Sequence, residues 1–138
     1  MSEIENYLCP VQLDNAIKVL ADTEVTILCG GTDLSPQTDT GQCEYSTTLM
    51  NIRRIDGLSG IESKDNTIRI GALTTVTEIM ESPVIQDCAA VLVETADQFA
   101  SDQIRNAASI GGNLCNASPA GDMSISLLVL DAGVELAH

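Results

Sequence analysis

Two glycine pairs mark the segments of this sequence best suited to hold a small anionic ligand. Residues 27–34 read Ile-Leu-Cys-Gly-Gly-Thr-Asp-Leu, and residues 109–113 read Ser-Ile-Gly-Gly-Asn. Glycine permits positive φ and lets the backbone approach a ligand closely. Successive N–H groups in such a turn form an anion site without any lysine. Each pair is also compatible with an ordinary tight turn, so the pairs alone leave both interpretations open.

Other kinds of site are disfavoured by residue type and spacing. Neither glycine pair matches the G-x-G-x-x-G or G-x-x-x-x-G-K-[ST] pattern, which disfavours a Rossmann site and a P-loop. The one histidine is His138, so a histidine-based catalytic triad is not expected. The five cysteines are widely spaced and form no C-x-x-C pair, which argues against metal ligation and a disulfide framework. We predict no catalytic residue and no metal ligand here, and a reducing, cytoplasmic location.

The charge of the chain excludes further partners. The 138 residues carry a net charge of −14, which repels nucleic acid and anionic membrane surfaces. The apolar run at residues 88–93 is too short to span a bilayer, so we predict neither nucleic-acid nor membrane binding. A diphosphate remains possible, because surface carboxylates are screened beyond about 8–10 Å while backbone dipoles act at contact range.

The elements around the first glycine pair indicate a small parallel layer. Apolar spacing predicts a helix over residues 14–21, and β-rich runs predict strands at 25–28 and 47–52. Residues 35–46 are polar and contain Pro36 and Gly41, which is typical of a loop or a poorly formed helix. This order predicts a βαβ-like unit.

The second part of the chain combines a hairpin with helices. Residues 60–63 and 67–70 alternate around Asp65-Asn66, which predicts a β-hairpin. Thr75 and Glu78 have capping-box spacing for a helix that ends at residue 81. Further spacing predicts one long helix over 85–99, a buried helix over 122–130 and a strand over 134–137. The positions on the core face of the long helix are Ile85, Cys88, Ala89, Leu92, Ala96 and Phe99.

Five motifs in order resemble one protein family. They are residues 27–34, residues 49–52 (Leu-Met-Asn-Ile), residues 68–75 (Ile-Arg-Ile-Gly-Ala-Leu-Thr-Thr), residues 103–106 (Gln-Ile-Arg-Asn) leading into 109–113, and residues 118–122 (Ser-Pro-Ala-Gly-Asp). Together they are similar to the FAD-binding subunit of the molybdenum hydroxylases, the family of xanthine dehydrogenase and carbon monoxide dehydrogenase. The similarity extends over nearly the whole chain.

The resemblance implies an α+β fold, the non-Rossmann FAD-binding fold of the molybdopterin dehydrogenases. It predicts a small parallel βαβ-like subdomain at residues 1–54. A second, mainly antiparallel subdomain is predicted at residues 55–138, with FAD lying between the two. Because the family subunit is longer than this chain, we expect the fold to be truncated and the second subdomain to be incomplete at its C-terminus.

The resemblance also assigns the cofactor contacts. The first glycine segment would surround the pyrophosphate with backbone N–H groups. The second would form another clamp from the Ser109 and Asn113 side chains beside glycine backbone, and Asp122 would supply a further contact. Phe99 matches an aromatic residue near the flavin in some members, and is equally compatible with the last core position of a helix. The predicted FAD-binding residues are Ile27, Leu28, Cys29, Gly30, Gly31, Thr32, Asp33, Leu34, Phe99, Ser109, Ile110, Gly111, Gly112, Asn113 and Asp122.

The function implied is electron transfer within an oxidoreductase. In such a flavoprotein, electrons pass from 2Fe–2S clusters through FAD to NAD or another acceptor, while the clusters and the molybdopterin belong to partner subunits. We expect the chain alone to be inactive and to bind FAD weakly. The alternative is an acidic, non-catalytic interaction module that docks to partner subunits without flavin. An unpaired sheet edge at residues 134–137 would also favour self-association.

Overall fold

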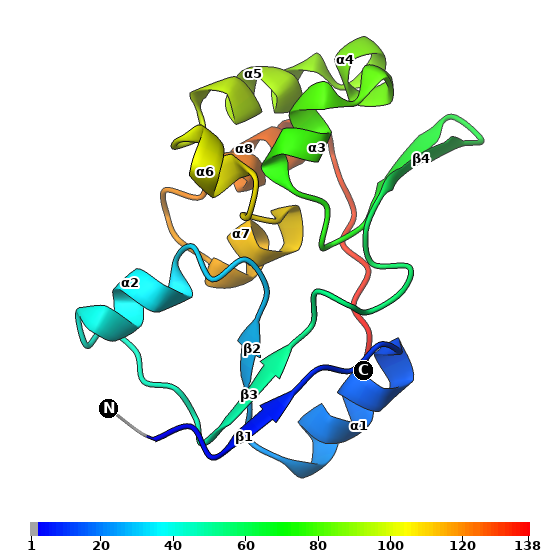
Figure 1. The fold of residues 1–138 in the computed structure, drawn as a ribbon. Helices are drawn as coiled ribbons and strands as arrows, with labels where there is room; N and C mark the ends of the chain where they lie inside the picture. Colours follow the sequence, from blue (N-terminus) through cyan, green and yellow to red (C-terminus); the bar gives the residue numbers. More distant parts are fainter. Residues whose placement is uncertain (1–2) are drawn as a thin grey trace. The chain divides into compact units, whose positions relative to one another are not determined.

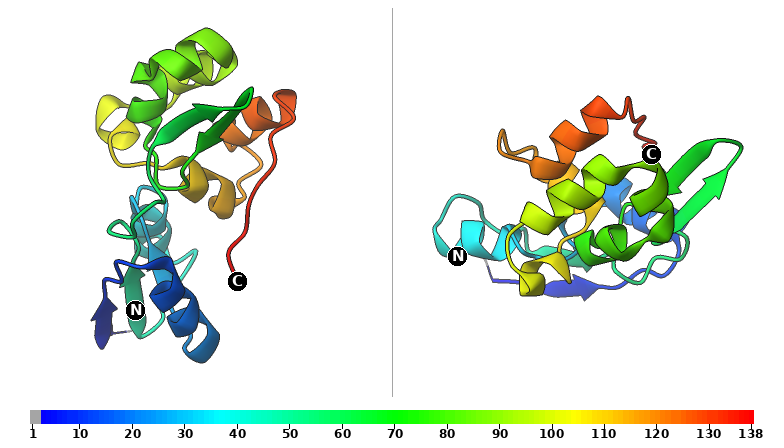
Figure 2. Two further views of the ribbon diagram at one scale, coloured as in Figure 1. Left: turned by 90° about the vertical axis from the view of Figure 1, so that its right-hand side faces the viewer. Right: turned by 90° about the horizontal axis from the view of Figure 1, so that it is seen from above.

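The chain forms two compact units (Figures 1 and 2). The computed structural model describes residues 3–138. The first unit runs to Asp56 and includes Leu136–His138, and the second unit is Gly57–Glu135. The elements of the first unit are β1 (Asn6–Leu8), α1 (Leu13–Asp22), β2 (Thr26–Leu28), α2 (Leu34–Asp39) and β3 (Thr48–Asn51). Those of the second are β4 (Ile61–Lys64), β5 (Thr67–Ile70), α3 (Val76–Glu81), α4 (Pro83–Cys88), α5 (Ala90–Gln98), α6 (Asp102–Arg105), α7 (Ile110–Asn116) and α8 (Asp122–Val129).

The first unit is built on a three-stranded parallel sheet in the order β1-β3-β2. Three consecutive residues of β3, Thr48 to Met50, are buried, as expected of a central parallel strand covered on both faces. The predicted helix at 14–21 and the strands at 25–28 and 47–52 are confirmed. β1 was not predicted, because it has only three residues and is exposed at two of them.

The segment after the first glycine pair contains a short helix. α2 occupies the start of the stretch predicted as a loop or a poorly formed helix. Pro36 is compatible with it because the first turn of a helix needs no intrahelical N–H donors. The helix ends before Gly41, whose φ is +72°.

The hairpin of the second unit is confirmed, with β4 and β5 antiparallel and Lys64 opposite Thr67. Asp65 and Asn66 have φ of 51° and 60°. Two consecutive positive φ angles fit a two-residue type I′ turn, whose twist matches that of the strands. The capping box is also confirmed: Glu78 N donates to Thr75 Oγ1 at 3.2 Å, and Thr75 N donates to Glu78 Oε2 at 2.7 Å.

The prediction of one long helix over 85–99 is wrong, because the chain leaves the helical conformation at Ala89 (φ −144°, ψ 49°). Two helices, α4 and α5, replace it. The break lets both helices point apolar residues into one core, where Ile85, Ala89 and Leu92 are buried. Cys88 is exposed instead of facing that core. Three- and four-residue spacing continues across the break, so periodicity could not reveal it.

Two expectations for the C-terminal region are also wrong. α8 is a helix, but it is not buried all round: Ile125, Leu128 and Val129 are 61%, 79% and 71% exposed. Residues 134–137 form no strand. The predicted sheet edge is therefore absent at those residues, and with it the reason given for self-association through that edge.

The core of the second unit is almost wholly aliphatic. It contains Val76, Ile79, Ile85, Ala89, Leu92, Ala96, Phe99, Ala108, Ile110 and Met123. These residues come from α3, α4, α5, α7 and α8 and from the loop positions 89, 99 and 108 next to them, so the helices depend on one another for burial. None of the helices formed by residues 3–138 has both the length and the apolar character needed to cross a membrane.

We predict that Thr75→Ala lowers the free energy of unfolding by about 1 kcal/mol, because it removes the oxygen that caps α3. Urea unfolding followed by circular dichroism measures this change. Thr47→Ala is the matched control, because Thr47 is exposed outside any helix or strand. Equal effects of the two substitutions would contradict the role of the capping box.

Candidate functional site

The first glycine segment is a tight connection from β2 to α2. Gly31 has a φ of +71°, and a Cβ at that position would lie 3.2 Å from Leu28 Cδ1. Positive φ at this point requires glycine, since other L-residues are strained there. The chain can therefore turn at once from the end of the strand into the helix.

The turn contains three consecutive backbone amides, those of Gly30, Gly31 and Thr32. Within the described residues, the N–H groups of Gly30, Gly31 and Thr32 donate no hydrogen bond, while the carbonyl of Gly31 accepts one from Ser35 N at 3.1 Å. All three residues are partly exposed. Unpaired N–H groups that follow one another around a left-handed residue are what an anionic ligand requires.

The second glycine segment differs, because it lies inside a helix. Ser109 is the N-cap of α7, and its Oγ accepts from Gly112 N at 3.1 Å. Ile110 N donates to Thr74 O at 3.0 Å, and Gly111 N donates to Ala72 O at 2.8 Å. The amides of Ile110, Gly111 and Gly112 at the start of α7 are therefore already bonded within the protein.

The two glycines of α7 have different roles. A Cβ on Gly111 would lie 2.7 Å from the Ala72 carbonyl oxygen and 2.8 Å from Ala72 Cβ. Such contacts are too short for any side chain, so glycine is required for packing. Gly112 is exposed, and a Cβ there would meet only Ser109 Oγ at 3.0 Å. Gly112 is therefore the more exposed glycine of this pair, while Gly111 is only partly exposed.

Asn113 carries the one orphaned polar atom found among the buried side chains of residues 3–138. Its Oδ1 is buried and accepts no hydrogen bond. A buried acceptor without a donor costs about 1–3 kcal/mol, so an incoming N–H or O–H donor would be stabilised there. A Cβ on buried Gly121 would lie 3.6 Å from this oxygen, so the turn before α8 borders the same atom.

The remaining predicted residues occupy different surroundings. Asp122 is exposed and is the first residue of α8, directly after Gly121. Because Gly121 lies near Asn113 Oδ1, Asn113 and Asp122 belong to the same region of the second unit. Phe99 is 9% exposed in the core at the end of α5, which favours its structural interpretation. Ile110 is also a core residue.

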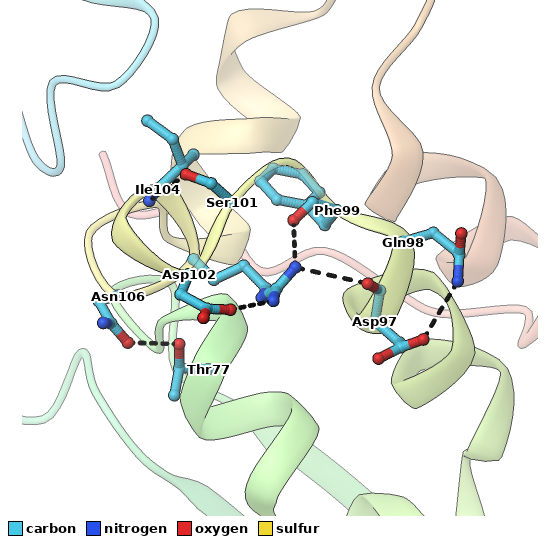
Figure 3. A network of polar contacts seen from close by, with 9 residues as sticks. Thr77, Asp97, Gln98, Phe99, Ser101, Asp102, Ile104 and Asn106 are labelled. Atoms are coloured by element: carbon cyan, nitrogen blue, oxygen red, sulfur yellow. Dashed lines mark hydrogen bonds and ion pairs between the residues drawn. The ribbon is translucent and has the colours of Figure 1, made fainter.

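Arg105 and Asn106 have structural roles that their place in the motif at residues 103–106 does not reveal. Arg105 pairs with Asp102, and its Nη1 donates to the carbonyl oxygens of Phe99 at 2.8 Å and Asp97 at 3.4 Å (Figure 3). Thr77 Oγ1 donates to Asn106 Oδ1 at 2.7 Å. These contacts hold α6 against the end of α5 and against α3. α6 ends shortly before Ser109, the N-cap of α7.

We predict opposite effects for the two glycines of α7. Gly111→Ala should lower the free energy of unfolding by about 1–3 kcal/mol, because the methyl group cannot be accommodated against Ala72. Gly112→Ala should leave stability unchanged or raise it by up to about 1 kcal/mol, as alanine favours a helix. Chemical unfolding of both variants measures this difference. Loss of stability in Gly112→Ala alone would contradict the geometry.

Sequence and structure comparisons place the chain among known proteins. The family described as "FAD binding domain in molybdopterin dehydrogenase" matches residues 2–138. The nicotinate dehydrogenase FAD-subunit of Eubacterium barkeri is 37% identical over 133 residues, 94% of this chain and 45% of that protein. The xanthine dehydrogenase FAD-binding subunit of Escherichia coli O157:H7 is 33% identical over 138 residues, 99% of this chain and 47% of that protein.

The fold agrees with these sequence matches. Carbon monoxide dehydrogenase from Hydrogenophaga pseudoflava superimposes with a TM-score of 0.81 at 30% identity, over 86% of this chain and 41% of that chain. The chain spans about half the length of the curated relatives that it matches. It belongs to the family of FAD-binding domains in molybdopterin dehydrogenases.

Proposed function

We propose that this chain binds FAD as part of an oxidoreductase of the molybdenum hydroxylase type. The observation that carries the proposal is the run of unbonded amides at Gly30, Gly31 and Thr32, in a chain that belongs to an FAD-binding family. These amides suit the diphosphate of a dinucleotide, since they supply partial positive charge without a basic residue. This is compatible with the net charge of −14.

The first segment, residues 27–34, is proposed to hold the diphosphate. Gly30 and Gly31 present backbone without a Cβ, so phosphate oxygens can approach to hydrogen-bond distance. Charge-assisted hydrogen bonds of this kind contribute about 1.5–3 kcal/mol each. The neighbouring residues Cys29, Thr32 and Asp33 complete the turn that positions the amides.

The second segment is proposed to contact the cofactor through side chains more than through amides. Asn113 Oδ1 is a buried acceptor without a donor, and hydroxyl and N–H groups of FAD are suitable donors. Exposed Gly112 leaves room for the ligand beside it, and the Asp122 carboxylate is a further acceptor in the same region. Ser109 and Gly111 have a positioning role, because they cap and pack α7.

The proposed reaction context is electron transfer between partner subunits. When bound, FAD supplies the redox chemistry, while the protein binds, orients and tunes it. We propose that the partners are a 2Fe–2S subunit and a molybdopterin-binding subunit, and that NAD or another acceptor receives the electrons. Relatives named as nicotinate and xanthine dehydrogenase subunits support this context. The exposed thiols of Cys9, Cys88 and Cys115 are typical of a reducing compartment, and we propose a cytoplasmic location.

Titration of the purified chain with FAD, followed by flavin fluorescence, tests the proposal. We expect binding with a Kd above about 1 µM, and a Kd at least about tenfold higher for Gly31→Ala. Gly41→Ala is the matched control, because Gly41 also has a positive φ (+72°) in the same unit but has no atom within 4 Å of an added Cβ. Both variants therefore carry similar backbone strain.

The two variants separate binding from folding. If Gly41→Ala weakens FAD binding as much as Gly31→Ala does, the effect comes from strain and the diphosphate assignment is wrong. A folded wild-type chain that binds no FAD at millimolar concentration would contradict the proposed function and support the flavin-free interaction module.

A second prediction concerns Asn113. We expect Asn113→Ala to leave the free energy of unfolding unchanged or slightly raised, because it removes a buried acceptor that has no partner. The Kd for FAD should rise about five- to tenfold. Thermal unfolding and FAD titration of the same sample measure both quantities. A variant that loses stability but keeps its FAD affinity would show that Asn113 is structural.

A further inference from the structure

Asp56 and Gly57 form the single Asp-Gly pair of the sequence, which contains no Asn-Gly pair. An aspartate before glycine can react within the main chain, because glycine has no side chain to shield its amide nitrogen from the aspartate carboxyl group. A fold prevents this reaction when it hydrogen-bonds the amide or binds the carboxylate. The surroundings of the pair therefore determine whether it is protected.

The pair lies in an open turn that follows β3 and precedes β4 in the chain. Asp56 and Gly57 are both exposed to solvent. Gly57 has a φ of +76°, and a Cβ built at this position would have no atom within 4 Å. No neighbouring group among the described residues therefore blocks the approach of the Asp56 carboxyl group to the Gly57 amide.

The two reacting groups have no competing partner. Among residues 3–138, Gly57 N donates no hydrogen bond, and the Asp56 carboxylate accepts none and forms no ion pair. The main-chain bonds beside the pair use other atoms. Asp56 N donates to Val11 O at 3.0 Å, and Leu73 N donates to Leu58 O at 2.7 Å. The fold thus holds the neighbouring main chain and leaves the Gly57 amide and the Asp56 carboxylate free.

We propose that Asp56 is a modification site, at which the chain forms isoaspartate without an enzyme. Gly57 N attacks Asp56 Cγ, so that an N–Cγ bond forms and the carboxyl OH leaves with the amide hydrogen as water. A water molecule then adds to the main-chain carbonyl carbon of Asp56 and breaks its bond to Gly57 N. The steps release and consume one water each and require no oxidant, reductant or second protein.

The product has a different backbone. The main chain now passes through Asp56 Cβ and Cγ, which adds one carbon atom between Asp56 and Gly57. Because the first unit runs to Asp56 and the second begins at Gly57, the covalent connection between the units becomes longer. The carboxylate that is set free is the main-chain one, the group that isoaspartyl carboxyl methyltransferases recognise. The modified chain is thereby a substrate for that class of enzyme, which is a property independent of FAD binding.

Prolonged incubation of the folded chain at neutral pH, followed by peptide mass spectrometry and labelling with an isoaspartyl methyltransferase, tests the proposal. Thr23→Gly is the matched control, because it creates a second exposed Asp-Gly pair at residues 22 and 23, where Thr23 N donates to Val19 O at 2.9 Å. In this variant we expect isoaspartate to form at least about fivefold faster at Asp56 than at Asp22, whose following amide is bonded. Asp56→Glu should remove the label at residue 56, because glutamate closes a larger ring more slowly.

Equal rates at Asp56 and Asp22 in Thr23→Gly would overturn the proposal, because the Asp-Gly sequence and not the open turn would then control the reaction. A rate at Asp56 more than about tenfold lower in the folded chain than in urea would also overturn it, since the fold would then protect the pair. Circular dichroism before and after incubation monitors folding. None of these measurements involves flavin, so failure here is distinguishable from failure of the proposed FAD binding.

Discussion

The second unit depends on three backbone hydrogen bonds between the segment before α3 and the segment that begins α7. Val76 N donates to Ala108 O, Ile110 N to Thr74 O and Gly111 N to Ala72 O, at 3.0, 3.0 and 2.8 Å. They hold together two stretches more than thirty residues apart in the sequence. Because they occur at the starts of two helices, they also satisfy donors that a helix leaves without intrahelical partners.

These bonds explain why two similar glycine pairs have different roles. The pair at Gly111 and Gly112 is part of the packing, and its amides are bonded to the protein. The pair at Gly30 and Gly31 belongs to a short turn whose amides remain available. The first unit thus offers free backbone donors, while the second offers the buried side-chain acceptor of Asn113. Neither feature uses a lysine or arginine, so the proposed diphosphate site is compatible with a strongly acidic chain.

The helices of the second unit are joined to one another by hydrogen bonds, but the outer side of α8 is exposed to solvent. Arg105 and Asn106 join α6 to α5 and α3, and Ser126 joins α8 to α5. The outer side of α8 has no comparable contacts among the described residues. The same helix therefore completes one apolar core and presents a second apolar surface to solvent.

The sequence by itself determined those elements that depend only on residues near one another in the chain. The hairpin follows from Asp65-Asn66, the start of α3 from Thr75 and Glu78, and the family from motifs that keep their order. The break at Ala89, the bare face of α8 and the bonding of the second glycine pair were decided by tertiary structure. Each depends on residues distant in the sequence. The chain breaks at Ala89 so that α4 and α5 can share one core, and the outer face of α8 is exposed because no described residue packs on it. The Gly111 amide is bonded because it meets the carbonyl of Ala72. The spacing of residues in the sequence shows which positions are apolar or flexible. Which other residues they contact is determined only by the packing of the folded chain.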